Sequence, residues 1–250
     1  PVDAGCLMLY SPKRDLTPHE ASLITAYLNG GGSLMLNTSP EVAESCPNLN
    51  SVVAAFGLTA RKGLVQEGDT SFISGSQYTL VPTVSTQHTA TAYVTSGGFK
   101  PQLPNCHAIG VAATLPAGVT VTPLFTTSDK AVLVTLDKTA NLTEAGKLEV
   151  AVAAAKSVTT AEGTTKTANL TWIASANAFT DTISRAYRLG VKQQNSLYSC
   201  IDQAYKNQGI IASNPETWNN LAPTFDMVYD IYINDPDIPK NDSLEAAMQD

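Results

Sequence analysis

The stretch LTPHEASLITAYLNGGGSLMLN, residues 16–37, decides the fold because it holds a helix start, a helix stop and a following strand. Thr17 is a favourable N-cap, Pro18 suits the first helical position and Glu20 completes a capping box, so we expect a helix to begin at Pro18. Apolar residues then recur at spacings of three and four, which gives this helix one face to bury. The glycines of residues 29–32 predict its end, since glycine reaches positive φ without a Cβ clash.

Short apolar runs flank this helix, CLMLY at residues 6–10 and SLMLN at residues 33–37. Apolar strands joined through an amphipathic helix are typical of parallel neighbours covered on both faces. A second helix is predicted from Asn48, with an apolar face formed by Leu49, Val52, Val53 and Phe56. The first sixty residues therefore indicate an α/β fold with a mainly parallel or mixed central sheet flanked by helices.

The composition changes over about residues 66–135, where Thr, Ser, Val and Tyr dominate and no long helical period appears. We expect a β-rich middle segment of short strands and turns. The candidate strands are residues 71–73, 78–81, 91–94, 108–113 and 119–122, followed by 123–130 and 131–135 around a tight turn.

The last third of the chain mixes strand and helix patterns. LEVAVAAA at residues 148–155 and NLTWIAS at 169–175 predict two strands, with residues 156–166 as the loop between them. A helix is expected from about Ser196 to Asn207. Residues 227–233 alternate as a strand does. We expect an α/β domain over residues 1–214 and a C-terminal extension over 215–250, packed on the same domain.

Charge and composition exclude several classes of protein. The net charge is −7 in 250 residues and the pI is near 4.9, so neither nucleic acid nor an anionic membrane surface is expected as a partner. The sequence shows no signal-peptide pattern and no run of eighteen apolar residues. Because a strand pattern begins within six residues, we expect targeting and membrane-anchoring segments to lie outside this chain.

Catalytic and metal-binding patterns find little support. The three histidines, His19, His88 and His107, have no nucleophile placed beside them in sequence, and GxSxG is absent. Residues 30–32 follow a helix, whereas a phosphate cradle needs a strand that leads into a helix. The acidic cluster of residues 235–242 lacks the glycine and terminal glutamate of a calcium loop. We therefore expect no enzyme activity, no metal and no cofactor.

The cysteines and aromatic residues leave alternatives open. Cys6 and Cys200 are expected to be buried thiols, whereas Cys46 and Cys106 lie in loop-like sequence and are either free or paired as a disulfide in an oxidising compartment. Six of the Tyr and Trp residues in the last third form either core or a partner surface. They are Tyr187, Tyr198, Tyr205, Trp218, Tyr229 and Tyr232.

The order of these motifs resembles the auxiliary extracytoplasmic domain of gliding-motility-type ABC transport systems. The matching residues of the opening unit are Pro12, Leu16, Thr17, Glu20, Tyr27, Leu28, Gly31 and Gly32. VTPLFTTSDKAVL, LEVAVAAA and LTWIASANAFTD resemble later segments of that family. Gln194 replaces the glycine of its Gly-Asn motif. The resemblance covers about residues 3–207.

The resemblance implies a glutamine amidotransferase-like or flavodoxin-like α/β fold without the catalytic cysteine. It implies an extracytoplasmic domain that is anchored to the cytoplasmic membrane and works with an ABC permease and an ATPase. No catalytic residue is carried over from the family. The expected function is thus that of a non-enzymatic accessory domain, which acts through protein or ligand interaction.

A ligand of an α/β sheet is expected at the carboxyl ends of its parallel strands, where the loops form a crevice. Pro12, Ser39 and Asn177 head the loops predicted there, so they are the candidate ligand-binding residues. Two alternatives remain. One is a carbohydrate- or peptide-binding module built on the Thr-rich middle, and the other is a degenerate amidotransferase- or hydrolase-like enzyme.

Overall fold

The computed structural model describes residues 4–160, 163–176, 178, 191–211, 214, 216, 217 and 220–249. The chain divides into two compact units, Pro1–Ala178 and Phe179–Asp250. The sequence places its boundary after residue 214 instead. The helix that ends at Asn207 shares an apolar core with the helices that follow it, which explains why the structural division comes earlier.

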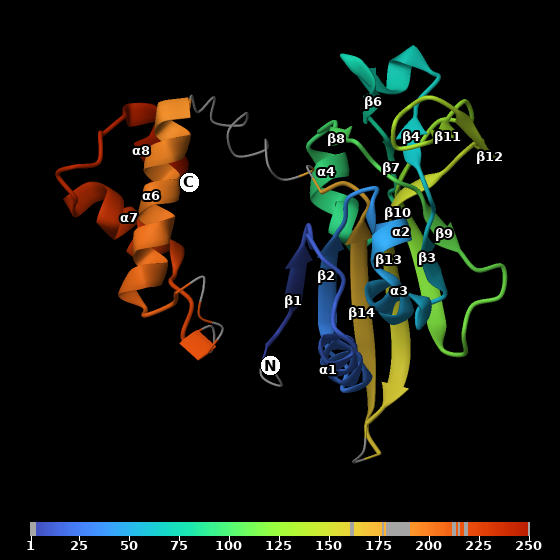
Figure 1. The fold of residues 1–250 in the computed structure, drawn as a ribbon, viewed down its shortest axis with the longest axis horizontal. Helices are drawn as coiled ribbons and strands as arrows, with labels where there is room; N and C mark the ends of the chain where they lie inside the picture. Colours follow the sequence, from blue (N-terminus) through green and yellow to red (C-terminus); the bar gives the residue numbers. More distant parts are fainter. Residues whose placement is uncertain are drawn as a thin grey trace. The chain divides into compact units, whose positions relative to one another are not determined.

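The first unit is built on a mixed sheet of eight strands (Figure 1). The main path, in spatial order, is β1 (Leu7–Tyr10), β2 (Ser33–Asn37), β14 (Thr165–Ile173), β13 (Glu149–Thr159), β10 (Val119–Thr126) and β7 (Thr83–Val84). Strands β1, β2 and β14 are parallel to one another, whereas β13, β10 and β7 continue antiparallel. β9 (Ile109–Val111) pairs with β13 and also with β3 (Leu58–Ala60).

Two small sheets complete the strand-rich middle of the chain. One contains β12 (Asn141–Ala145), β11 (Val132–Val134) and β4 (Leu64–Gln66), and the other β5 (Ile73–Ser74), β6 (Ser76–Leu80) and β8 (Leu103–Pro104). Short helical turns lie between these strands: η1 (Thr70–Phe72), η2 (Thr89–Thr91) and α4 (Ala92–Ser96). The mixed α/β class and the β-rich middle are therefore confirmed.

Helices α1 (Pro18–Asn29) and α3 (Pro47–Ala54), with the short α2 (Val42–Ser45), pack against one face of the large sheet. The core on this face includes Leu34 and Leu36 of β2, Trp172 of β14 and the α3 residues Leu49, Val52 and Val53. A second cluster joins β13 and β10 to the small sheets through Leu80, Leu103, Leu124, Leu133 and Val150. The large sheet is thus covered on both faces over its centre.

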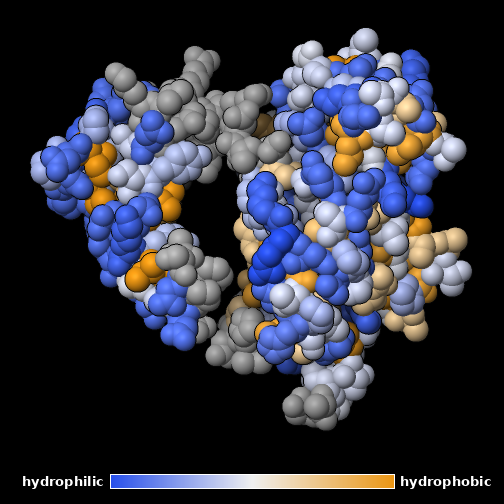
Figure 2. All heavy atoms as spheres, viewed as in Figure 1, coloured by the Kyte–Doolittle hydropathy of each residue, from blue (hydrophilic) through white to orange (hydrophobic). Residues whose placement is uncertain are grey.

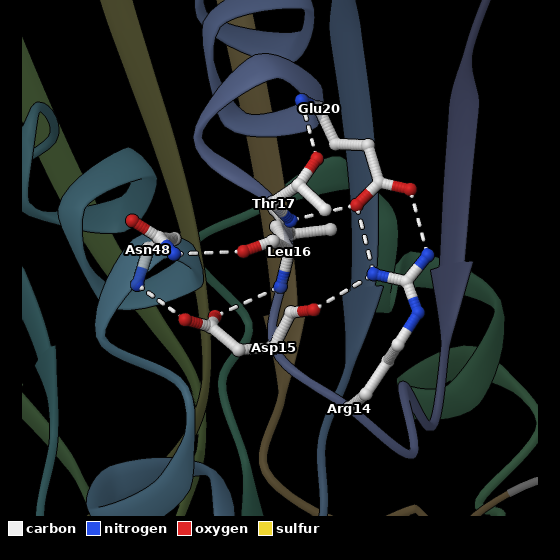
Figure 3. A network of polar contacts seen from close by, with 6 residues as sticks. All are labelled: Arg14, Asp15, Leu16, Thr17, Glu20 and Asn48. Carbon is white, nitrogen blue, oxygen red and sulfur yellow. Dashed lines mark hydrogen bonds and ion pairs between the residues drawn. The ribbon is translucent and has the colours of Figure 1, made fainter.

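Helix α1 begins as its sequence predicts (Figure 3). The Thr17 hydroxyl accepts a hydrogen bond from the Glu20 amide at 3.2 Å, and the Thr17 amide donates to the Glu20 carboxylate at 2.7 Å. The Arg14 guanidinium also donates twice to that carboxylate, at 2.9 and 2.8 Å. At the other end, Gly31 has a φ of 88°, a conformation that favours glycine.

Helix α3 begins through a residue far away in sequence. Its own N-cap, Cys46, makes no side-chain capping bond. Instead the Asp15 carboxylate accepts a hydrogen bond from the Asn48 amide at 2.9 Å (Figure 3). It accepts another from the Leu49 amide at 3.1 Å. The Asn48 side chain returns a bond to the Leu16 carbonyl at 2.8 Å. Asp15 therefore ties the loop after β1 to the start of α3, because a carboxylate satisfies the free amides of a first helical turn.

Several local expectations in the first unit are wrong. Residues 91–94, predicted as a strand, lie in η2 and α4. Described residues within 156–166 belong mostly to β13 and β14, which form one long hairpin rather than two strands joined by a long loop. Residues 131–135 contain β11, which pairs with β12 and β4 and not with β10. In the last two cases the β-branched and threonine-rich sequence fits more than one partner strand, so pairing across the chain decides.

The prediction that Cys6 is a buried thiol is wrong. Cys6 precedes β1 and is exposed, because β1 is the edge strand of the large sheet. Cys46 and Cys106 are buried, and each is a free thiol, as are Cys6 and Cys200. Burial raises the pKa of the Cys106 thiol. Cys200 is buried in its helix, as expected.

The second unit contains α6 (Val191–Asn207), α7 (Phe225–Asn234) and α8 (Asp242–Gln249). Its core consists of Cys200, Ala204, Val228, Tyr232, Ile238, Leu244 and Met248. The strand predicted over residues 227–233 is wrong, since these residues lie in α7 behind the N-cap Thr224. Val228 and Tyr232 are four residues apart, so the same sequence also gives a helix an apolar face. No helix in the described part of the chain is long and apolar enough to cross a membrane.

Candidate functional site

A cavity of about 500 Å³ lies at the carboxyl ends of the parallel strands β1, β2 and β14. Pro12 from the loop after β1 and Ser39 from the loop after β2 line it together. Ala176, shortly after the end of β14, lines it as well. The third predicted residue, Asn177, lies outside the described residues. The structure thus brings Pro12 and Ser39 to one cavity at the predicted edge of the sheet.

The rest of the wall includes residues that the sequence did not indicate. The segment from Pro40 to Cys46, which contains α2, forms one side. The β-rich middle forms another through Leu64, Asn105, Leu136 and Lys138. These residues come from separate loops and small sheets, so no spacing in the sequence could have joined them to Pro12 and Ser39.

The loops around the cavity carry an unusual backbone conformation. Ser11, Asn105 and Lys138 have positive φ values of 46°, 49° and 64°, and they are the non-glycine residues in this conformation within the described ranges. Asn105 and Lys138 line the cavity, and Ser11 directly precedes Pro12. Side chains with a Cβ adopt this region at a cost of about 1–3 kcal/mol each, and such residues cluster at functional sites. Their concentration here marks the cavity as the candidate binding site.

Three charged side chains lie in the cavity wall, Lys13, Glu41 and Lys138. The Lys13 ammonium donates a hydrogen bond to the Ser11 hydroxyl at 3.1 Å. The Lys138 ammonium lies 4.2 Å from the centre of the Tyr78 ring, in cation–π contact. Interaction with the Ser39 side chain is the largest cause that lowers the pKa of Glu41, and the charge of Lys13 acts in the same direction. The site therefore presents two cations and one carboxylate at neutral pH.

A buried polar network lies at the end of β2, next to the loop that heads the cavity. The Thr38 hydroxyl is 2.7 Å from His107 Nε2, and it accepts a hydrogen bond from the Trp172 indole at 2.7 Å. His107 Nδ1 is 2.9 Å from the Ala108 carbonyl oxygen, which can only accept, so Nδ1 carries the proton and Nε2 accepts from Thr38. Burial lowers the pKa of His107 to about 4, so the ring is neutral at pH 7.

The Thr38–His107 pair has the distance of a nucleophile and its base, yet it lacks the remaining features of such a site. Both side chains have 0% exposure, so a substrate has no access to them. The Nδ1 of His107 faces a carbonyl and not a carboxylate. His88 instead accepts the Ala90 amide at the start of η2, and His19 is exposed on α1. The network joins β2 and β14 to the segment that carries Asn105, which fixes the cavity wall.

Asn37 adds one unexplained feature to this edge of the sheet. Its side chain is fully buried, and both of its polar atoms lack a hydrogen-bond partner. Buried side-chain amides normally have such partners, so Asn37 is an exception at this edge of the sheet. Within the described residues, no group of three or more potential metal ligands is found.

The aromatic residues of the last third divide between core and surface. Tyr232 is fully buried in the core of the second unit, and Tyr229 packs against that core. Tyr198 and Tyr205 are exposed on α6. Tyr187 and Trp218 lie outside the described residues. Figure 2 shows hydrophilic residues over much of the visible surface of the second unit, with separate hydrophobic residues among them.

Comparison with known proteins finds no matching family model and no matching curated protein. Among solved structures the chain is similar to the protein titled mmIFT52 N-terminal domain, with 10% sequence identity and a TM-score of 0.48. The similarity covers 76% of this chain and 79% of that one. It is too distant to support any statement about function.

Proposed function

We propose that this chain is a non-enzymatic accessory domain that acts by binding a ligand in the cavity at the carboxyl ends of β1, β2 and β14. One observation carries the proposal. Pro12 and Ser39 line the same cavity as Asn105 and Lys138, which have positive φ values. α/β sheets bind ligands at this edge because the loops there diverge and leave a crevice. A volume of about 500 Å³ is within the range of small-molecule sites.

The sequence resemblance extends this proposal to a cellular role. In that reading the domain is extracytoplasmic, belongs to a membrane-anchored component of an ABC transport system and works with a permease and an ATPase. The finer fold proposed is the amidotransferase-like arrangement. The parallel β1, β2 and β14, with α1 and α3 on one face, are compatible with it, while the antiparallel half of the sheet is an addition.

Filling the cavity tests the binding role. Leu136 lines the cavity and is 36% exposed, so Leu136→Trp places bulk in the site with little effect on the core. Leu23 lies on α1 outside the lining and is 49% exposed, so Leu23→Trp is the matched control. We expect small polar metabolites to shift amide resonances around Pro12 and Ser39 in the natural chain and in the control, and not in Leu136→Trp. Shifts that persist in Leu136→Trp would contradict the proposal.

The proposed transport role needs its own measurement. We expect the full-length protein, crosslinked in its native membrane and purified, to carry an ABC permease and an ATPase with it. Recovery without either of them would remove the transport role and leave the binding role standing.

One observation favours a second candidate, a carbohydrate-binding module. Tyr93 and Phe99 are exposed and stack on each other, with ring centres 5.4 Å apart. Exposed rings offer a stacking surface to sugars. Substituting both by alanine should abolish binding to an immobilised polysaccharide panel in this case, and should leave the shifts around Pro12 and Ser39 unchanged.

A further inference from the structure

The charge of the cavity wall differs from that of the protein as a whole. The chain has a net charge of −7, with 22 carboxylate and 15 Lys and Arg side chains. The residues that line the cavity, however, include two lysines, Lys13 and Lys138, and a single carboxylate, Glu41. A positively charged recess in an acidic protein attracts anions locally, because fields are focused in clefts with low-dielectric walls.

Within the part of the chain that the structure describes, neither lysine forms a salt bridge. The salt bridges among the described residues involve Arg14, Arg61, Lys130 and Lys206, and none involves Lys13 or Lys138. The Lys13 ammonium contacts a hydroxyl, and the Lys138 ammonium contacts a ring face. Ammonium groups have three donors each, so both retain capacity to donate to a ligand.

Each ammonium group has one contact that restricts its position, the Ser11 hydroxyl for Lys13 and the Tyr78 ring for Lys138. Lys138 lies in a turn in which the Asp137 carboxylate accepts hydrogen bonds from the hydroxyls of Thr135 and Thr139. The Lys138 backbone amide donates to the Thr135 carbonyl at 2.8 Å. The Tyr78 ring fixes the end of its side chain. Pro12 restricts the backbone directly before Lys13. Such preorganisation lowers the entropic cost of binding.

From this arrangement we infer that the cavity binds a small molecule with an anionic carboxylate or phosphate group, which Lys13 and Lys138 bind together. This inference rests on the binding function proposed above. The apolar part of the ligand packs on Val42, Leu64 and Leu136. Glu41 accepts a hydrogen bond from a hydroxyl or amine of the ligand.

Four probes distinguish the chemistry: succinate and inorganic phosphate as anions, succinamide as the uncharged counterpart of succinate, and putrescine as a cation. Binding is followed by amide chemical shifts at Ser39, Asn105 and Lys138 at low ionic strength, where weak electrostatic binding is strongest. We expect succinate or phosphate to shift these resonances, and succinamide and putrescine to leave them unchanged. The stronger of the two anions identifies whether the natural group is a carboxylate or a phosphate.

The variants test the two lysines. Replacing both by alanine, Lys13→Ala with Lys138→Ala, should weaken anion binding by about tenfold or more for each lysine, as expected for hydrogen bonds to charged groups. Lys100→Ala with Lys147→Ala removes two exposed lysines outside the lining and is the charge-matched control, which should bind as the natural chain does.

The outcomes separate the two proposals. If succinamide or putrescine shifts the cavity resonances as strongly as the anions do, the binding function stands and the anionic preference is overturned. If the anions bind equally well to the lysine double variant, the assignment to Lys13 and Lys138 is overturned. If no polar metabolite and none of the four probes at millimolar concentration shifts these resonances, both the function and the inference fall.

Discussion

The sheet unit, residues 4–178, and the helical unit, residues 191–249, show two ways of building a core. In the first unit, helices and small sheets pack on the two faces of one large sheet, and its core contains large buried side chains such as Trp172 and Phe56. The second packs three helices around the much smaller cluster that includes Tyr232 and Leu244. A sheet with both faces covered buries more apolar surface per residue than a few short helices, so we expect the first unit to be the more stable.

The two units also use polar side chains differently. In the sheet unit they form caps and buried networks, such as Asp15 at α3 and Thr38 between His107 and Trp172. Residues 191–249 contain eight carboxylate and three lysine side chains. The α7 carboxylates Asp226 and Asp230 are exposed. Polar groups that bond within the protein fix the position of loops, whereas solvated ones do not. In the sheet unit the Thr38 network lies beside the loop that carries Ser39 into the cavity wall.

The largest expected effect comes from Trp172→Ala. The indole is buried against the helices and donates to Thr38, so its loss should destabilise the sheet unit by about 3–5 kcal/mol, the usual cost of truncating a buried aromatic residue. Amide hydrogen exchange, measured residue by residue as urea is added, reports the free energy of unfolding of each unit separately. Equal destabilisation of both units would show that they unfold as one, and would contradict the view that each unit has its own stability.

A smaller effect is expected for Leu244→Ala in the helical unit. Leu244 is fully buried, and a leucine truncation in a core costs about 2–4 kcal/mol. The change should accelerate hydrogen exchange in α6 and α7 and leave β2 and β14 unaffected. Leu221→Ala is the control, because Leu221 is 77% exposed and its loss should change stability by about 0.5 kcal/mol at most.

Asp15→Ala tests the long-range cap. It removes the carboxylate that accepts from the Leu16, Asn48 and Leu49 amides, so we expect a loss of about 1–2 kcal/mol from the sheet unit. Thermal unfolding measures this loss. Asp15→Asn keeps one acceptor oxygen and should fall between the alanine variant and the natural chain, whereas an asparagine variant as damaged as the alanine one would contradict a capping role.

The smallest effect concerns pH. The Arg14 guanidinium and the Thr17 amide hold the pKa of Glu20 at about 2, below its ordinary value of 4.5. Because the pKa is lowered in the folded state, this contribution to stability is complete above about pH 4.5 and is lost as the pH falls toward 2. Glu20→Gln should flatten the slope of stability against pH in that window. An unchanged slope would mean that other carboxylates dominate it.

The accuracy of the sequence reading follows the range of the interactions involved. Helix α1 and strand β2 are predicted at their observed positions, since Thr17, Glu20 and the glycines act on residues within four positions. The α3 face formed by Leu49, Val52 and Val53 is buried as predicted. The strand predicted over residues 227–233 is wrong because its apolar pattern fits a helix as well, and only the core of Cys200, Val228 and Leu244 selects the helix.

The candidate site divides in the same way. The sequence alone placed Pro12 and Ser39 after two parallel strands, because consecutive strands joined by a helix run in one direction and end at one edge. Only the tertiary structure brought Asn105, Leu136 and Lys138 opposite them. The physical reason is distance along the chain. Helix caps and turns depend on neighbouring residues, whereas a cavity wall depends on strand pairings between distant segments, such as β14 with β2, where Asn169 pairs with Ser33.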